Sequence, residues 1–270
     1  EFSVKEVVQC MRWIPPGRFM MGSPEDEPMH VDWEAPVHSV ELKDGFWLFD
    51  TPVTQKLYEA VMEENPSIFV SPDRPVEEVS HKQAGQFIER LNAVVPGLGL
   101  MLPSESQWEY ACRAGSTTAL YSGSIEILGE RNAPALDAIA WYGGNSGKGY
   151  ELDRGVDSSD WSEKQYDHST AGTMPVKRKR PNAWGLHDML GNVWEWTADH
   201  WHESYEGAPE DGSAWLSEDE DARRVVRGGS WYDKPHFVRS SFRHHDAPVD
   251  HYVTLGFRCA RAERSAASQW

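Results

Sequence analysis

The stretch RGGSWYDKPHFVRSSFRHHDAPVDHYVTLGFR, residues 227–258, has rigid ends and a middle rich in aromatic, histidine and aspartate side chains. Gly228 and Gly229 permit backbone torsions and close approaches that other residues do not, and Trp231 supplies a large anchor. The ends therefore have the composition of a framework. The middle is left to serve as an active site, a metal site or a contact surface.

The composition of the middle favours contact over chemistry. Between Tyr232 and Thr254 the chain has no Glu, Gln, Met or Trp, although all four occur elsewhere. Tyr, Phe and His bring rigid, amphipathic contact area at a small entropic cost, as in antibody paratopes. Segment 231–255 is therefore predicted to be a ligand-binding surface made by Tyr232, Asp233, His236, Phe237, Phe242, His244, His245, Asp246, His251 and Tyr252.

Overall composition limits the classes of partner. The 270 residues are 39% hydrophobic, and a formal net charge of −17 argues against nucleic acid as a partner. The one basic cluster, KRKR at 177–180, is interpreted as a solvated loop. No apolar run approaches the roughly 18 residues of a membrane helix, so no membrane insertion is expected. Three widely separated cysteines predict a reducing compartment, which we take to be the cytoplasm.

Frequent proline, glycine and tryptophan predict an α+β fold with low regular secondary structure. Helices are predicted over 51–64 with Thr54 as N-cap, over 80–95 with Ser80 as N-cap, and over 104–115 with a capping box of Ser104 and Gln107 and a stop at Gly115. The first two helices would bury Leu57, Tyr58, Val61 and Met62, and Ala84, Phe87, Ile88 and Leu91. Strands are predicted within 11–23, 38–50 and 223–231, and residues 125–225 are predicted to be mostly loops.

Eight sequence blocks occur in one characteristic order. They are WIPPGRFMMGS, TPVTQKLYEAVM, NPSIF, RPVEEVSHKQAGQFIERLN, LPSESQWEYACRAG, NAWGLHDMLGNVWEW, RVVRGGSW and LGFRCAR. From about residue 10 to residue 262 the chain thereby resembles the formylglycine-generating enzyme (sulfatase-modifying factor) family. The resemblance implies a single domain over 1–270 with a C-type-lectin-like fold, two main helices and small antiparallel sheets. Because the chain starts at Glu1, we also expect a fused or associated N-terminal effector domain in the parent protein.

The resemblance also implies a calcium ion held by Asp188, Gly191, Val193 and Glu195. Carboxylates and backbone carbonyls are the hard oxygen ligands that calcium takes. The alternative is that Asp188 and Glu195 only accept hydrogen bonds. A second calcium site, on Asn145 or Asp153, is a weaker implication because the loop departs from the family pattern.

The catalytic pattern of the family is broken. Authentic formylglycine-generating enzymes carry two copper-binding cysteines shortly after GGS, and the matching positions here are Asp233 and Val238. Copper(I) requires soft thiolate ligands, so no copper is expected. Iron, as in related sulfoxide synthases, is not expected either. Adjacent His244 and His245 would point to opposite faces of an extended segment, and the helical domain that supplies iron ligands in those enzymes has no counterpart.

Codon arithmetic suggests how the surface varies. Tyr, Asp, His, Phe, Val, Ser and Thr are all reachable from the asparagine codon AAC by changing adenines, and only Lys234 departs from this pattern. The segment therefore resembles the variable region of proteins diversified by retroelements, with Arg239, Arg243, Pro248 and Arg258 holding the backbone. Three functions remain open: a module binding a protein, peptide or glycan, a metal- or oxygen-dependent oxidoreductase, and a regulatory domain of a larger protein.

Overall fold

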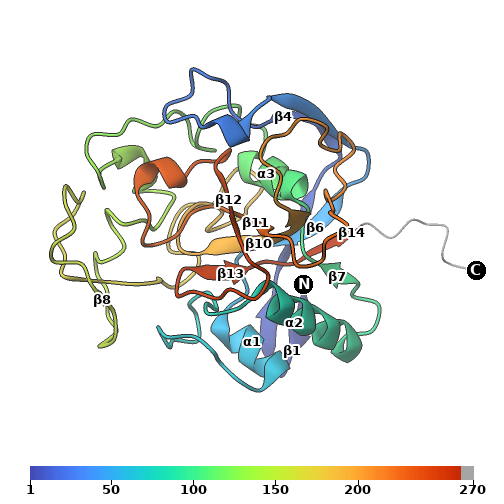
Figure 1. The fold of residues 1–270 in the computed structure, drawn as a ribbon. Coiled ribbons are helices and arrows are strands. Elements are labelled where there is room, and N and C mark those ends of the chain that lie inside the picture. The colour runs from blue at the N-terminus through green and yellow to red at the C-terminus, as the bar shows by residue number, and fades with distance from the viewer. Residues whose placement is uncertain (263–270) are drawn as a thin grey trace, which may run out of the picture.

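A computed structural model of the chain describes residues 1–262 and shows an α+β fold with little regular secondary structure (Figure 1). In this range the α-helices are α1 (Gln55–Met62), α2 (His81–Val94) and α3 (Glu105–Arg113). The strands are β1 (Phe2–Val4), β2 (Val7–Gln9), β3 (Met11–Ile14), β4 (Gly17–Met21), β5 (His38–Leu42), β6 (Phe46–Phe49), β7 (Leu100–Met101), β8 (Val156–Asp157), β9 (Thr170–Ala171), β10 (Trp194–His200), β11 (Arg224–Arg227), β12 (Arg243–Asp246), β13 (Leu255–Phe257) and β14 (Ala260–Ala262).

The three predicted helices begin directly after their predicted N-cap residues. Ser80 and Ser104 each close a capping box with the glutamine three residues later, which satisfies backbone donors at the start of α2 and α3. Thr54 precedes α1, although its side chain makes no capping hydrogen bond. Every apolar residue predicted on the inner faces of α1 and α2 is buried. The third helix ends at Arg113, and the residue that follows it, Ala114, adopts the left-handed conformation one position before the predicted stop at Gly115.

Two four-stranded sheets form the centre, in the orders β12-β11-β10-β13 and β3-β6-β14-β7. The predicted strand regions 11–23 and 38–50 each divide into two strands. The longest strand, β10, lies in the region predicted to be loops, so that prediction is wrong for these residues. Its sequence alternates apolar and polar side chains, but nearly all of them are buried. β10 pairs with β13 in parallel, so the sheets are not all antiparallel as expected.

The core divides into two large hydrophobic clusters. One packs α3 against β4, β5 and β6, and the other packs α1 and α2 against β10 and β13. In Figure 1, α1 and α2 lie side by side at the bottom, and the irregular chain around β8 forms the left edge. Much of residues 125–190 is irregular, as predicted, and a third cluster around Trp231 helps to anchor it.

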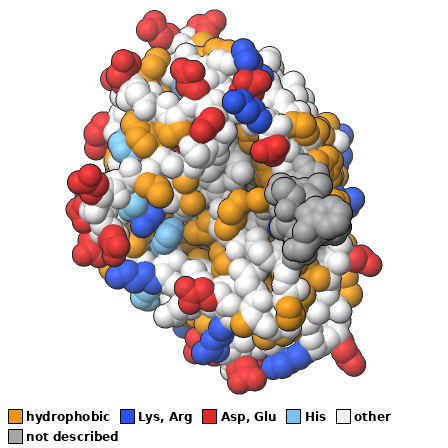
Figure 2. All heavy atoms as spheres, turned by 90° about the vertical axis from the view of Figure 1, so that its right-hand side faces the viewer, with side chains coloured by type: hydrophobic (Ala, Val, Ile, Leu, Met, Phe, Trp, Pro, Cys, Tyr) orange, Lys and Arg blue, Asp and Glu red, His pale blue; other side chains and the backbone are white. Residues whose placement is uncertain are grey.

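Figure 2 shows the right-hand side of the molecule, where hydrophobic side chains gather near the middle and carboxylates stand along the edges. Within residues 1–262, no helix has both the length and the apolar character needed to cross a bilayer. The basic cluster at 177–180 is mostly exposed, yet two of its lysines are paired: Lys177 with Asp50 at 2.8 Å and Lys179 with Asp137 at 3.4 Å.

Candidate functional site: the surface of residues 231–255

Segment 231–255 connects β11 to β13 and contains a 3-10 turn, Pro235–Phe237, and the edge strand β12. Trp231 closes its base, because the buried indole donates a hydrogen bond to the carbonyl of Val253 at 2.9 Å. The rings of Phe69 and Trp161 pack against the same indole, with centroids at 5.3 and 6.2 Å. Trp231 is therefore an anchor, as its size predicts.

Arg239 ties the middle of the segment to the loop between β4 and β5. The fully buried guanidinium contacts Glu27 at 2.5 Å and Glu34 at 2.6 Å. It also donates to the carbonyl of Met29 and to the hydroxyl of Ser241. A buried charge is stable only when it is paired and hydrogen-bonded, and Arg239 meets both conditions.

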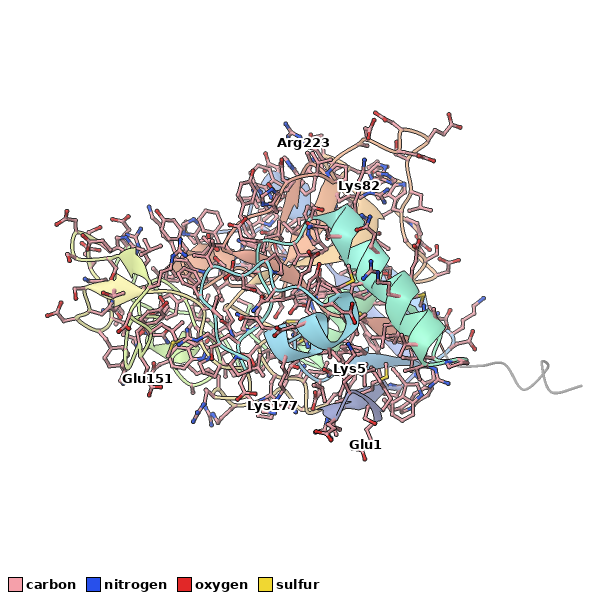
Figure 3. The ribbon with its side chains drawn as sticks, turned by 90° about the horizontal axis from the view of Figure 1, so that it is seen from below. Glu1, Lys5, Lys82, Glu151, Lys177 and Arg223 are labelled. Atoms are coloured by element: carbon pink, nitrogen blue, oxygen red, sulfur yellow. The ribbon has the colours of Figure 1, made fainter. Side chains whose placement is uncertain are left out.

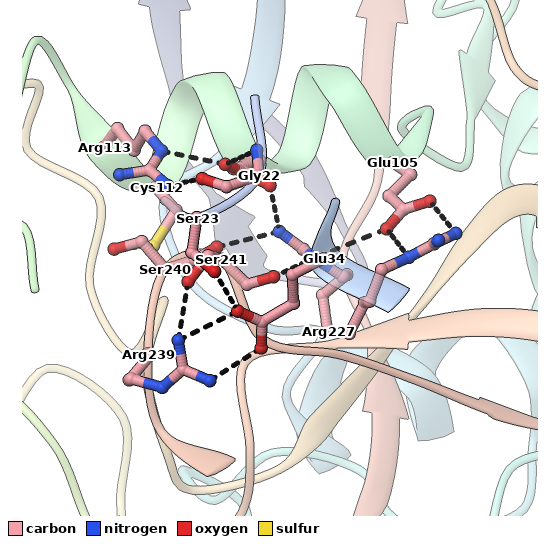
Figure 4. Close-up of polar contacts among 12 residues, drawn as sticks. Gly22, Ser23, Glu34, Glu105, Cys112, Arg113, Arg227, Arg239, Ser240 and Ser241 are labelled. Carbon is pink, nitrogen blue, oxygen red and sulfur yellow. Dashed lines mark hydrogen bonds and ion pairs between the residues drawn. The ribbon is translucent and has the colours of Figure 1, made fainter. Parts of the chain in front are cut away.

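Two further arginines fasten the segment to α3 (Figure 4). Arg243 contacts Glu105 through two hydrogen bonds of 2.8 Å, and Arg227 contacts Glu109 at 2.5 Å. Arg227 also donates to the backbone carbonyls of Ser240 and of the next residue. Bidentate and charge-assisted bonds of this kind fix geometry strongly. Arg239, Arg243, Pro248 and Arg258, the residues expected to hold the backbone, are all buried.

Most of the predicted ligand-binding residues reach the surface. Tyr232 and Tyr252 are each 46% exposed, and His244 and His251 are also exposed. Asp233, His236, Phe237, His245 and Asp246 are partly exposed. The backbone frame below them is buried, so solvent-facing and buried positions of the segment are clearly separated.

Aromatic rings form a continuous row that joins surface positions through two buried rings, Phe242 and Trp194. From His236 the row passes to Phe237 and Phe242, with centroid separations of 3.9 and 5.0 Å. It continues through the ring of Trp194 to His244, 5.8 Å away. His245 extends the row to Trp201, with centroids at 5.1 and 4.5 Å. Tyr232 lies apart from this row, against Trp161, and His251 contacts Glu78 at 2.6 Å.

Two predicted ligand residues have structural roles instead. Phe242 is only 2% exposed and packs in the cluster of α1 and α2, so its place in the recognition surface was wrong. The carboxylate of Asp233 accepts hydrogen bonds from the backbone N–H of Ser230 at 2.8 Å and from its hydroxyl at 2.5 Å. Burial raises the pKa of Asp233 to about 6. Its oxygens stabilise the turn after Gly229.

The rings of the two histidines of β12, His244 and His245, lie together. Their rings are nearly parallel, with centroids 5.1 Å apart, so His244 and His245 do not point to opposite faces as expected. Burial lowers the pKa of His244 to about 4, and it also lowers the pKa of His245. Among residues 1–262, no group of three His, Cys, Asp or Glu side chains is placed to hold a metal ion.

The positions that match the copper-binding cysteines do not fit copper. Val238 is fully buried and aliphatic, and the carboxylate of Asp233 is engaged by Ser230. Copper(I) prefers soft sulfur ligands, which neither side chain supplies. Cys112 and Cys259 are buried, and desolvation raises the pKa of both thiols, to about 12 for Cys112. The buried position of Cys259 is the one its sequence context predicts.

The four residues of the expected calcium site have other partners. The carboxylate of Glu195 receives two hydrogen bonds of 2.7 Å from Arg258 and one of 2.8 Å from the indole of Trp108. Asp188 accepts from the backbone N–H of Lys177 at 2.9 Å. In this arrangement the carboxylates do not fit calcium, because the guanidinium of Arg258 neutralises the charge of Glu195. The pairing favours the alternative that Asp188 and Glu195 only accept hydrogen bonds, and the predicted calcium site on Asp188, Gly191, Val193 and Glu195 is one that EDTA tests.

The second calcium site, on Asn145 or Asp153, also remains a prediction. The side-chain amide of Asn145 is buried and bonds the backbone of Tyr142 and Ala140. These bonds shape the turn that follows Trp141.

Sequence reasoning missed three residues that border the surface. Trp161 packs against Tyr232, Trp194 lies between Phe242 and His244, and Trp201 packs against His245. All three belong to the region predicted to be loops, where tryptophans were expected to act as anchors. Their local sequence carries no signal that links them to a segment several tens of residues later.

Comparisons with known proteins agree with the geometry. A family model described as the sulfatase-modifying factor enzyme 1-like domain matches residues 2–263. The inactive C-alpha-formylglycine-generating enzyme 2 of Mus musculus is 28% identical, over 93% of this chain and 85% of its own.

Two solved structures share the fold. PvdO from Pseudomonas aeruginosa is 29% identical with a TM-score of 0.76, and the similarity covers 94% of each chain. Treponema denticola variable protein 1 is 25% identical with a TM-score of 0.77, over 97% of this chain and 98% of its own. The C-type-lectin-like fold of the formylglycine-generating-enzyme type is thereby shown.

Proposed function

Because the chain belongs to the sulfatase-modifying factor family but carries Asp233 and Val238 where its oxidising members bind copper, we propose that it is a non-catalytic binding module. In this proposal the solvent-facing residues of segment 231–255 recognise the ligand. Catalysis through copper would need two thiolates close together, and the sequence places an aspartate and a valine there.

The observation that carries the proposal is that the side chains which hold the backbone are buried, whereas those that could contact a ligand face solvent. Three buried arginines fix the backbone, whereas Tyr232, His244 and Tyr252 are exposed and make few polar contacts. A rigid backbone lowers the entropy lost when a ligand binds, and exposed aromatic rings supply contact area. Substitutions at exposed positions cost little stability, so such a surface can change its specificity without losing its fold.

Two relatives support this proposal. The name of Treponema denticola variable protein 1 describes a variable protein on the same fold, and the mouse relative is named as inactive. Together with the codon pattern of the segment, they favour diversification by a retroelement. A gene neighbourhood with a reverse transcriptase and a near-identical template repeat that differs at adenines would support that origin.

The ligand that the surface fits best is a protein or peptide. The row of His236, Phe237, His244 and His245 is aromatic and uncharged when both β12 histidines are neutral, and such rings are typical of protein interfaces. Asp246 and His251 at the margin add polar contacts. A glycan remains the second class of ligand, since aromatic rings also stack on sugars.

Arrays of peptides and glycans test the proposal with matched variants. Tyr232→Ala, His244→Ala and Tyr252→Ala should abolish or alter array binding while the melting temperature stays near that of the parent. Phe242→Ala should lower the unfolding free energy by about 3–5 kcal/mol. Lys5→Ala serves as the control, because Lys5 lies on another side of the molecule from Arg223 (Figure 3).

An array pattern that all three surface variants leave unchanged would contradict the recognition surface. Oxygen consumption by the copper-loaded protein with a cysteine-containing peptide would contradict the non-catalytic role. Loss of folding in the three surface variants would show that the exposed side chains belong to the frame.

A further inference from the structure

A separate pocket of about 290 Å³ lies between Arg74, in the connection from α1 to α2, and the loops 141–151 and 174–178. Its polar walls come from Arg74, Trp141, Lys148, Glu151 and Arg178. In Figure 3, Glu151 is well separated from Arg223, whose guanidinium contacts His245 of the recognition surface. This pocket is therefore distinct from the surface of residues 231–255.

Two buried donors in the pocket have no partner among the described residues. Arg74 is 2% exposed, and its Nε and Nη1 atoms are buried without a hydrogen bond. The indole Nε1 of Trp141 is likewise buried and unpaired. A buried donor without an acceptor costs free energy, more so when it is charged, and native proteins rarely leave one. Such donors point to a missing acceptor.

The position of Arg74 is fixed by packing, not by an ion pair. Its guanidinium lies 5.0 Å from the centroid of the Tyr150 ring, and desolvation by burial lowers its pKa. The hydroxyl of Tyr150 in turn donates to the carbonyl of Arg154 at 2.7 Å. The stacked ring holds the guanidinium in place while its donors remain available.

Positive charge gathers around these donors although the chain as a whole has a net charge of −17. Lys148 and Arg178 line the pocket from exposed loop positions, and Lys148 lies 3.6 Å from the centroid of the Tyr166 ring. Lys179 lies over the Trp141 ring at 3.8 Å, although Asp137 pairs with it. Glu151 is the acidic side chain in the lining, so the cations outnumber it.

We propose that this pocket binds a small organic anion, with a carboxylate or sulfate group accepting hydrogen bonds from Arg74 and Trp141. The planar guanidinium and the indole N–H both donate, which suits an oxyanion and opposes a cation. Met174 and Pro175 line the same pocket together with the face of Trp141, and these apolar groups fit an aromatic or aliphatic body on the anion. Lys148 and Arg178 close the mouth and add long-range attraction.

Isothermal titration of the full chain with benzoate, phenyl sulfate, acetate and the neutral isostere benzamide tests the proposal. We expect benzoate or phenyl sulfate to bind at least about tenfold more tightly than benzamide, because only the anions use the charge of Arg74. Acetate should bind more weakly than benzoate if the apolar wall contributes. Competition by inorganic sulfate would show that the sulfate group alone occupies the donors.

Variants separate binding from folding. Arg178→Gln and Lys148→Gln alter exposed side chains, so they should weaken benzoate binding several-fold without changing the melting temperature. Arg74→Met should remove binding, and Trp141→Phe should weaken it by removing one donor. Lys82→Gln is the matched control, because Lys82 is an exposed lysine on the far side of Figure 3 from Glu151.

Equal affinity for benzoate and benzamide would overturn the proposal, as would the absence of binding by every anion at about 10 mM. Unchanged benzoate affinity in Arg178→Gln and Lys148→Gln would also overturn it, whether or not Arg74→Met folds. None of these outcomes bears on the recognition surface, since no variant in the series changes a residue of segment 231–255.

Discussion

Replacing Arg239 by Met removes the charge that joins segment 231–255 to the loop between β4 and β5. Methionine keeps a similar stem, so the loss falls mainly on the polar contacts. In the folded protein Arg239 contacts Glu27 at 2.5 Å and Glu34 at 2.6 and 3.0 Å, and all three side chains are buried. The variant therefore leaves two carboxylates inside the protein without their cation.

Removing one partner of a buried ion pair costs about 3–5 kcal/mol, because the remaining charge is desolvated and unpaired. We expect Arg239→Met to lower the free energy of unfolding in urea by that amount. A second change, Glu34→Gln, removes one of the stranded charges, so the cost of Arg239→Met should be smaller in the Glu34→Gln background by about 0.5–3 kcal/mol. Arg18→Met is the control, since its exposed pair with Glu41 should contribute less than about 1 kcal/mol.

A loss below 1 kcal/mol for Arg239→Met, or an equal loss in both backgrounds, would refute the conclusion that the buried ion pairs of Arg239 hold segment 231–255 in place. The first result would mean that water or a rearranged loop replaces the guanidinium. The second would mean that Arg239 acts through packing of its stem, and its coupling to Glu34 would then be absent.

Two further changes test buried carboxylates. Burial raises the pKa of Glu77 to about 8 from 4.5, so the folded state binds more protons than the unfolded state and stability falls as the pH rises between these values. Glu77→Gln should therefore reduce the loss of melting temperature between pH 5 and pH 9, and parallel curves for variant and parent would oppose this. Arg258 neutralises Glu195, so we expect EDTA to leave the melting temperature unchanged and Glu195→Gln to be destabilising with or without EDTA. A melting temperature that EDTA lowers in the parent but not in Glu195→Gln would instead establish calcium at this place.

The helices could be predicted because their signals are local. Ser80 and Ser104 each stand three residues before the glutamine that completes the capping box, and the spacing of apolar residues marks the inner face. β10 was missed although the sequence over 194–199 alternates apolar and polar side chains, which is the local signal of a strand. Its polar residues Glu195, Thr197 and Asp199 are buried as well, so the alternation does not separate a solvent face from a core face.

The sequence indicates only one member of each buried ion pair that holds the segment. The arginines at 239 and 243 stand out in the segment, but their partners Glu27, Glu34 and Glu105 are separated from them by more than a hundred residues. No local pattern marks these glutamates as buried, because surface glutamates have the same sequence surroundings. Only the tertiary fold shows which of the chain's many carboxylates meet a guanidinium.

Composition predicts a contact surface in segment 231–255 but does not separate its buried from its exposed aromatic residues. Phe242 and Tyr252 occur in the same segment, yet Phe242 packs under β10 and Tyr252 faces solvent. The difference comes from β12, which pairs with β11 in a register that starts at Arg243 opposite Arg227. Phe242 directly precedes that pair and lies against Trp194, and this pairing cannot be read from aromatic content.

The same long-range pairing would allow the proposed variation of the surface without loss of the fold. Arg227 and Arg243 contact carboxylates of α3, and Arg239 contacts carboxylates of the loop before β5. The segment is therefore fixed by side chains that it does not display. A change at Tyr232, His244 or Tyr252 removes none of these contacts, whereas a change at any of the three arginines removes buried ion pairs. If the segment varies as proposed, the energetic cost of losing these ion pairs would confine variation to the solvent-facing positions, and this confinement would hold for any ligand that the surface binds.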